Sequence, residues 1–219
     1  VRWWLVLVGV LLVLGLGFKI YEIFKKSLWD GRNRINFLLK QEGALFVSFE
    51  PREENLVLIL VPKGTQLEVP HGYGQYRLEA ISELENLEKR QGLFAEAIQE
   101  NLAIPVEGWM EGAGSKGKGG GSKEEILTEL IKQMKGQGKT NFSGWDLLRL
   151  WWQIKKVKGA EVKVFDLAKL NVLTPRELPD GTEVFEIEQN SFDLQIKKFL
   201  SDSLLRKENL SIEVLNGTS

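Results

Sequence analysis

Two glycine-lysine stretches contain residue types that could hold a phosphate group. Residues 112–118 have the GxxxxGK spacing of a nucleotide-binding loop, but Gly119 stands where a serine or threonine would bind magnesium. Residues 138–140 (GKT) have the ending of such a loop, but Gln133 stands where its first glycine is required. A working loop follows a strand and opens a helix, so that backbone amides converge on the phosphate. The first stretch has low-complexity composition and the second follows a predicted helix, so neither predicts a nucleotide site.

Other reactive side chains are few. The 219 residues include no cysteine and one histidine, which excludes disulfides, a cysteine nucleophile and a multi-histidine metal centre. His71 lies in the turn-like segment PHGYG, and we interpret it as an exposed turn residue. We interpret the glutamate-rich run 79–88 as a solvated helix face. The net charge of −1 argues against a nucleic-acid partner.

Three tryptophans form the most distinctive apolar group. Trp145, Trp151 and Trp152 belong to a predicted helix that runs through LLRLWWQIKK (147–156), with the capping-box spacing of Ser143 and Asp146 ahead of that run. They could line an apolar ligand pocket, or they could belong to the core, as aromatic residues at helical spacing commonly do. Because this helix is apolar on several sides, we expect it to be covered on more than one face.

The elements that must position these residues alternate between strands and helices. The segments that predict strands are short and rich in β-branched or aromatic residues, or they alternate in hydropathy; they are 34–39, 44–49, 56–61, 66–69, 161–165, 183–187 and 210–215. The segments that predict amphipathic helices are 77–90, 93–102, 123–135 and 191–205. Segment 56–61 is apolar throughout, which predicts a central strand. This order indicates an α/β fold, a layered α-β-α domain with a mixed sheet.

An N-terminal apolar run predicts a membrane anchor. Residues 3–18 carry no charge, and extending the helix to Phe24 gives it about 33 Å, enough to cross a bilayer core. A cleaved signal peptide would need small residues after this run, and residues 19–26 (KIYEIFKK) offer none. We therefore expect residues 1–26 to be a transmembrane anchor with its flank, in a single-pass membrane protein.

The distribution of charge bears on where the domain lies relative to the membrane. Residues 1–29 contain four basic residues and one acidic residue, so residues 30–219 carry a net charge of −4. This balance gives no reason to expect the domain to lie on anionic lipid. The positive charges that follow the apolar run would place the domain in the cytoplasm by the positive-inside rule. The glycine-serine-lysine composition of residues 112–122 predicts a flexible linker.

Several segments, in order, resemble the LytR-CpsA-Psr family of cell-envelope proteins. RINFLL at 34–39 resembles the family's first strand, and residues 47–70 resemble its hairpin and "PRD" segment. The other similar segments are YRLEAI at 76–81, LAIPV at 102–106, the helix at 140–157, and SIEVLNG at 211–217. The resemblance implies a family-like α/β domain over residues 30–209. It also implies that residues 210–219 begin a truncated C-terminal segment.

The resemblance also implies a topology and an activity. Family members have one membrane helix and an extracellular domain, which places this domain outside, against the charge count. They transfer glycan polymers from a polyprenyl-pyrophosphate carrier to the bacterial cell wall.

This chain departs from the family pattern at the residues that handle pyrophosphate. The loop with an arginine-aspartate pair after the first strand is absent, since Leu39 leads directly through residues 40–43 into the next strand. Lys63 and Gly64 replace the arginine and aspartate of the "PRD" segment. Lysine does not reproduce the bidentate grip of an arginine on phosphate. The resemblance leaves Lys63 and Arg77 as remnants of an anionic-ligand site, and no catalytic residue or metal ligand.

Three functions remain open. The first is a membrane-anchored lipid-binding or scaffold module without transferase chemistry, with membrane lipid, polyprenyl phosphate or cell-wall glycan as its partner and no cofactor. The second is a divergent phosphotransferase that uses magnesium. The third is a membrane-tethered module that binds a protein partner which the sequence does not name.

Overall fold

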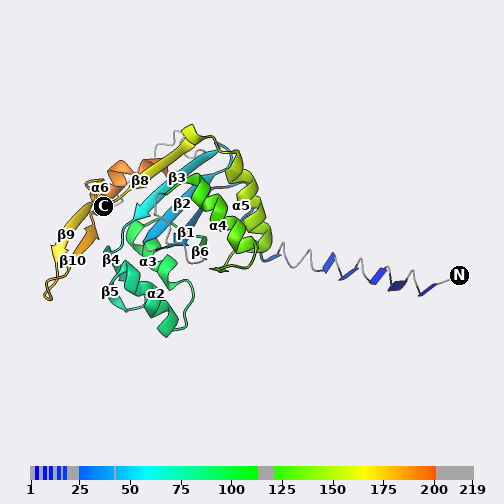
Figure 1. The fold of residues 1–219 in the computed structure, drawn as a ribbon, viewed down its shortest axis with the longest axis horizontal. Coiled ribbons are helices and arrows are strands. Elements are labelled where there is room, and N and C mark those ends of the chain that lie inside the picture. The colour runs from blue at the N-terminus through cyan, green and yellow to red at the C-terminus, as the bar shows by residue number, and fades with distance from the viewer. Residues whose placement is uncertain are drawn as a thin grey trace, which may run out of the picture.

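A mixed six-stranded sheet forms the centre of the domain (Figure 1). The computed structural model describes residues 25–41, 43–112 and 121–200, together with scattered positions between residues 3 and 18. The strand order is β7-β6-β1-β2-β3-β8. The strands are β1 (Ile35–Lys40), β2 (Ala44–Glu50), β3 (Asn55–Val61), β6 (Gly108–Glu111), β7 (Lys139–Thr140) and β8 (Val162–Asp166).

Four of these strands run in the same direction. The strand β1 pairs antiparallel with β2, and β2 pairs antiparallel with β3, so β1 and β3 point the same way. The strands β6 and β8 then join β1 and β3 in parallel. The carboxyl ends of β1, β3, β6 and β8 therefore meet at one edge of the sheet, which we call the carboxyl edge.

Alternating side chains on the central strands supply two separate cores. Along β1, Phe37 and Leu39 face one core, while Leu38 faces the other. This is the two-residue period of a strand that is covered on both faces. The strand β3 behaves in the same way, and all of its residues except Leu60 are buried. The apolar run at 56–61 correctly predicted a central strand.

Helices cover both faces of the sheet, which gives the predicted α-β-α layering (Figure 1). On one face lie α2 (Leu78–Leu87), α3 (Leu93–Leu102) and α6 (Gln189–Gln195). On the other lie α4 (Lys123–Met134) and α5 (Gly144–Lys156). Ser122 caps α4 by accepting from Glu125 N. Ser143 and Asp146 form a capping box on α5, as their spacing predicted.

Smaller elements border the α2/α3 face. The strands β4 (Gln66–Val69) and β5 (Gly74–Arg77) form one hairpin, and β9 (Leu173–Glu177) and β10 (Glu183–Ile187) form another. The two short 3₁₀ helices are η1 (Gly159–Glu161) and η2 (Lys197–Phe199).

Some predicted elements differ from the structure. The predicted helix at 191–205 begins earlier, as α6, and gives way to η2, while the remainder lies outside the described residues. The prediction that α5 is covered on several sides is wrong among the described residues, since Leu148 is 44% exposed and Trp152 is 59% exposed. The strand at 210–215, the C-terminal segment 210–219 and most of the linker also lie outside the described residues.

Within the described residues, no helix combines the length and apolarity needed to cross a membrane. Most of the expected anchor at residues 1–26 lies outside them. The anchor therefore stays a prediction.

Candidate functional site at the carboxyl edge

Polar side chains gather where the parallel strands end. Lys40 ends β1, Lys63 follows β3 by two residues, Glu111 ends β6, and Asp166 ends β8. In α/β sheets, ligand sites commonly lie beyond the carboxyl ends of the strands. The carboxyl edge is therefore the first place to look for a site.

Three adjoining cavities open along this edge. The Lys40 pocket has a volume of about 240 Å³, and its lining residues are Lys40, Ser82, Glu85, Asn86, Lys89, Gln91, Trp109, Glu111 and Lys139. The Asp166 pocket, of about 220 Å³, is lined by residues 41, 43–45, 60–63, 121 and 166. The Phe94 pocket, of about 530 Å³, is lined by Gln41, Gly43, Lys63, Leu78, Glu79, Ser82 and Phe94. Shared lining residues join the three cavities.

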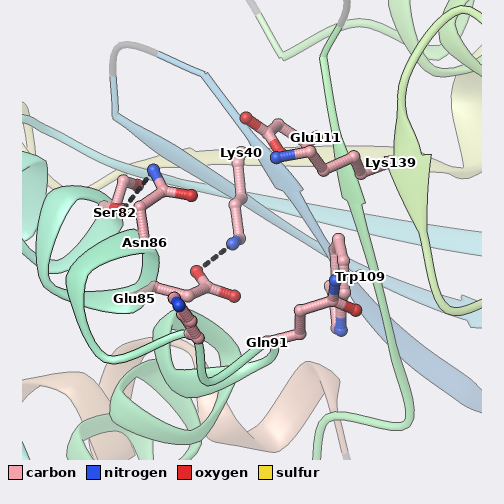
Figure 2. A pocket seen from close by; sticks show the side chains of 9 residues that line it. Lys40, Ser82, Glu85, Asn86, Gln91, Trp109, Glu111 and Lys139 are labelled. Carbon is pink, nitrogen blue, oxygen red and sulfur yellow. Dashed lines mark hydrogen bonds and ion pairs between the residues drawn. The ribbon is translucent and has the colours of Figure 1, made fainter.

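A buried ion pair forms the base of the Lys40 pocket. The Lys40 ammonium bonds to Glu85 Oε2, and both residues are 7% exposed (Figure 2). The ammonium also lies 4.8 Å from the Trp109 ring centroid and 5.2 Å from that of Phe94. Charged side chains are rarely buried without a partner. Here carboxylate and ring faces together replace the water that the lysine loses.

The second oxygen of Glu85 is also used. Glu85 Oε1 accepts from the Gly92 amide at 2.6 Å. Gly92 has a φ of 92° and precedes the first residue of α3, a conformation that favours glycine. The carboxylate therefore fixes the turn between α2 and α3 as well as the lysine. Across the opening, Glu111 and Lys139 form a looser, more exposed pair at 3.8 Å (Figure 2).

The Phe94 pocket has an apolar side and a polar side. Leu78 and Phe94 belong to the core of the α2/α3 face, and Lys63 and Gln41 belong to the carboxyl edge. The rim is tight at Gly43, where an added Cβ would lie 2.4 Å from the Val61 carbonyl oxygen. This cavity can therefore take a molecule that has both an apolar portion and an anionic or polar portion.

Only one of the two predicted cations lines the cavities. Lys63 lines both the Phe94 and the Asp166 pockets. Arg77, at the end of β5, is not among the residues that line the three cavities, and its Nη1 lies 3.8 Å from Glu79 Oε1. The other oxygen of Glu79 accepts from the Gly64 amide at 2.8 Å. Glu79 thus contacts both Arg77 and the backbone next to Lys63, and Lys63 is the cation that lines the cavities.

The three predicted pocket tryptophans lie elsewhere, on α5. None of them lines the three carboxyl-edge cavities. Trp151 packs partly against the α4/α5 core, while Trp152 is mostly exposed. A cation lies over each ring, with Arg149 over Trp145, Lys155 over Trp151 and Lys156 over Trp152.

Sequence analysis missed Lys40 and Glu85. The interpretation of residues 79–88 as a solvated face is wrong at Glu85, which is buried. Leu78, Ile81 and Glu85 share one helix face at i, i+3 and i+7, and this spacing was the available signal. Similarly, strand alternation puts Lys40 on the same face as the buried Leu38. His71 is an exposed turn residue as predicted, and its Nε2 lies 2.9 Å from Glu96 Oε2.

Three acidic residues at the edge are each paired with a lysine. Glu85 pairs with Lys40, Glu111 with Lys139, and Asp166 with Lys169 at 2.8 Å. In the part of the chain that the structure describes, no three acidic or histidine side chains are grouped so as to hold a metal ion. The described edge residues therefore do not provide the carboxylate cluster that magnesium prefers.

Comparison with known proteins identifies the fold. No family profile matches the chain, and no curated protein matches it by sequence. Among solved structures, TagT of Bacillus subtilis has a TM-score of 0.58 at 15% identity, with 78% of this chain and 91% of TagT covered. TagV of Bacillus subtilis has a TM-score of 0.56 at 11% identity, with coverages of 78% and 98%.

A further match carries a ligand. The LytR-CPS2A-Psr family protein YwtF (TagT) was solved with bound octaprenyl pyrophosphate lipid. It has a TM-score of 0.56 at 16% identity, with 80% of this chain and 93% of that one covered. The described domain therefore has the fold of LytR-CPS2A-Psr proteins, as the sequence resemblance predicted.

Proposed function

We propose that this chain, with its LytR-CPS2A-Psr fold, is a membrane-anchored cell-envelope protein that binds a polyprenyl phosphate lipid or its glycan-linked form. In this proposal it acts as a lipid-binding or scaffold module and does not transfer the glycan. Residues 1–26 anchor it, and the domain lies on the extracellular side. A protein of the same fold binds octaprenyl pyrophosphate, which supports a lipid of this class as the ligand.

The Phe94 pocket is the observation that carries the proposal. Its volume of about 530 Å³ lies within the range of ligand sites. Leu78 and Phe94 offer an apolar wall for part of a prenyl chain, and Lys63 offers a cation for the phosphate. A prenyl phosphate combines these two properties.

The kinds of cation at the edge favour binding over transfer. The described cations that line the three cavities are lysines, namely Lys40, Lys63, Lys89 and Lys139. Phosphoryl transfer depends on groups that are positioned to stabilise charge as it develops on the phosphate. Lys40 is already neutralised by Glu85, and a lysine binds phosphate as a point charge without the geometry of an arginine fork.

A binding titration tests the proposal. The full chain in lipid nanodiscs is titrated with a long-chain prenyl phosphate, its pyrophosphate and the matching prenyl alcohol. We expect both phosphates to bind more tightly than the alcohol. Lys63→Ala should weaken phosphate binding about tenfold, because a charge-assisted hydrogen bond contributes roughly 1.5 kcal/mol.

Matched variants separate the contributions. Lys135→Ala, on an exposed lysine beyond the end of α4, is the control and should leave phosphate affinity unchanged. Arg77→Ala examines the second predicted cation in the same titration. Equal binding of alcohol and phosphates would show that the tail alone is recognised and would remove Lys63 from the site.

An extended experiment distinguishes the other two functions. When magnesium and a glycan-linked prenyl pyrophosphate are added to the same nanodiscs, release of prenyl phosphate that depends on magnesium would show a divergent phosphotransferase. An absence of prenyl-lipid binding would leave the protein-interaction module.

A further inference from the structure

Helix α5 presents a face of tryptophan, leucine and basic residues to solvent. At 100° per residue, Trp145, Leu148 and Trp152 fall on one stripe. The buried residues Asp146, Leu147, Leu150 and Ile154 lie on the opposite side of the helix. Leu148 is 44% exposed and Trp152 is 59% exposed. We call Trp145, Leu148, Arg149, Trp152, Lys155 and Lys156 the α5 face.

This face is cationic as well as apolar. Arg149 lies 5.2 Å from the Trp145 ring, and Lys156 lies 5.5 Å from the Trp152 ring. The single acidic residue of the helix, Asp146, is fully buried on the other side. Lys155 and Lys156 therefore face solvent with no carboxylate from α5 beside them, and Arg149 is half-buried. Residues 30–219 as a whole nevertheless carry a negative charge.

The segment that follows the predicted anchor is fixed to this same helix. Ser27 Oγ and the Leu28 amide both donate to the Asp146 carboxylate. Further along, Arg149 Nη1 donates to the Trp29 carbonyl oxygen at 2.7 Å, and Gln153 Nε2 donates to the Gly31 carbonyl oxygen at 3.1 Å. The segment 27–31 thus runs along one flank of α5, beside the α5 face.

This attachment sets the distance from the bilayer. If the anchor ends at residue 26, Ser27 is the next residue, and one residue spans at most about 3.6 Å. The first turn of α5 must then lie at the membrane surface. Tryptophan is enriched at membrane–water interfaces, and basic residues are attracted to anionic headgroups.

We propose that the α5 face lies in the membrane interface and binds anionic lipid headgroups, so that the domain is held against the bilayer by a second contact besides the anchor. The inference rests on the anchored topology of the proposed function. A lipid surface is favoured over a protein partner because the tether brings this face to the bilayer and because the charged side chains that α5 contributes to it are all basic. The neighbouring acid is Asp30 of the tether, which interacts with Arg149. The contact orients the carboxyl-edge cavities relative to the membrane that holds their lipid.

Site-directed spin labelling tests this directly, because the chain has no cysteine to remove. The full chain is reconstituted in vesicles of phosphatidylcholine with phosphatidylglycerol and labelled at Leu148→Cys. Oxygen, which partitions into lipid, and a water-soluble nickel chelate serve as collision reagents. We expect the label to lie about 5–10 Å below the headgroup surface, as in interfacial helices.

Two matched leucine sites calibrate the result. Leu87, at the end of α2 on the other face of the sheet, is 79% exposed. A label at Leu87→Cys should therefore be accessible to the water-soluble nickel chelate. Leu11→Cys lies within the predicted anchor and should report the bilayer interior. A label at Leu148 that reports water while the Leu11 label reports lipid would overturn the α5 inference and leave the anchor standing. A Leu11 label in water would overturn both.

A charge reversal tests the role of the basic residues. Lys156→Glu should raise nickel accessibility at the Leu148 label in vesicles that contain phosphatidylglycerol. The effect should shrink in pure phosphatidylcholine, and Lys197→Glu on η2 should not produce it. A Leu148 label that neither reagent reaches, in vesicles and in detergent alike, would indicate cover by protein and would also overturn the inference.

Discussion

The two helical layers each bury a carboxylate, but they use it differently. On the α2/α3 face, Glu85 pairs with the Lys40 ammonium at the edge of an open cavity. On the α4/α5 face, Asp146 is fully buried, and its donors among the described residues are the uncharged groups of Ser27, Leu28 and Ser143. The first carboxylate neutralises a cation beside a pocket. The second joins the start of the domain to a helix.

This difference shows how one fold keeps its structural and its candidate binding functions apart. Four described donors, from residues 27–28 and from Ser143, bond to the Asp146 carboxylate and occupy both of its oxygens. The Glu85 pair borders a cavity of about 240 Å³ whose rim carries Asn86, Gln91 and Lys89. A ligand in the three pockets would lie beside Glu85 and away from Asp146, because no lining residue of these pockets belongs to α5.

The strongest test of this contrast is Lys40→Ala. The substitution leaves Glu85 buried without its cation, and breaking a buried ion pair typically costs about 3–5 kcal/mol. We expect the free energy of unfolding to fall by that amount in urea denaturation. Lys40→Met combined with Glu85→Gln should recover most of the loss, because the glutamine oxygen can still accept from Gly92. A loss below about 1 kcal/mol for Lys40→Ala would show that water replaces the lysine.

A smaller loss is expected for Asp146→Asn. The asparagine keeps one acceptor oxygen, but it loses the charge and part of the capping box, and we expect a destabilisation of about 2 kcal/mol. Amide exchange at Leu28 should accelerate together with exchange in the first turn of α5. Asp193→Asn, at a half-buried aspartate of α6 that pairs with Lys197, is the matched control. If Leu28 stays protected, the tether does not depend on the Asp146 carboxylate.

The smallest effect concerns pH at the same tether. The backbone amides of Asn33 and Arg32 hold the pKa of Asp30 below its ordinary value of 3.8. Because the folded pKa is lowered, the stabilisation is present above the ordinary value and is lost as the pH falls through the folded pKa. An NMR titration should show the amides of residues 32 and 33 shifting only in that acidic range. Asp30→Asn should remove the shift, and a midpoint above 3.8 would contradict the assignment.

Much of the fold could be predicted because local patterns were strong. The hairpin strands 44–49 and 56–61, the strand 66–69 and the helix 93–102 agree with β2, β3, β4 and α3. The strands β6 and β7 were missed since they are short and gain their stability from pairing with β1 and with each other. The strand β9 was missed because it contains Pro175, which a two-stranded hairpin tolerates at an edge.

The candidate site was only partly predictable. Lys63 was found through its place in a segment that resembles the family, and the structure places it on two cavities. Lys40 and Glu85 meet across 45 residues of sequence, and no local pattern reports such a pairing. The expectation for α5 was wrong because its apolar composition was interpreted as a sign of burial on several sides. Leu148 and Trp152 of this helix face solvent instead.

The attachment of residues 27–31 also determines how the domain would respond to mechanical load. Trp29 is buried against Phe49 just before β1, and β1 is hydrogen-bonded on both sides, to β2 and to β6. A pull on the N-terminus therefore acts along the length of a central strand, where many bonds must break together rather than one after another. Resistance of this kind is governed by the unfolding rate and not by equilibrium stability. If the proposed anchor transmits tension, that tension would reach the domain through the central strand β1.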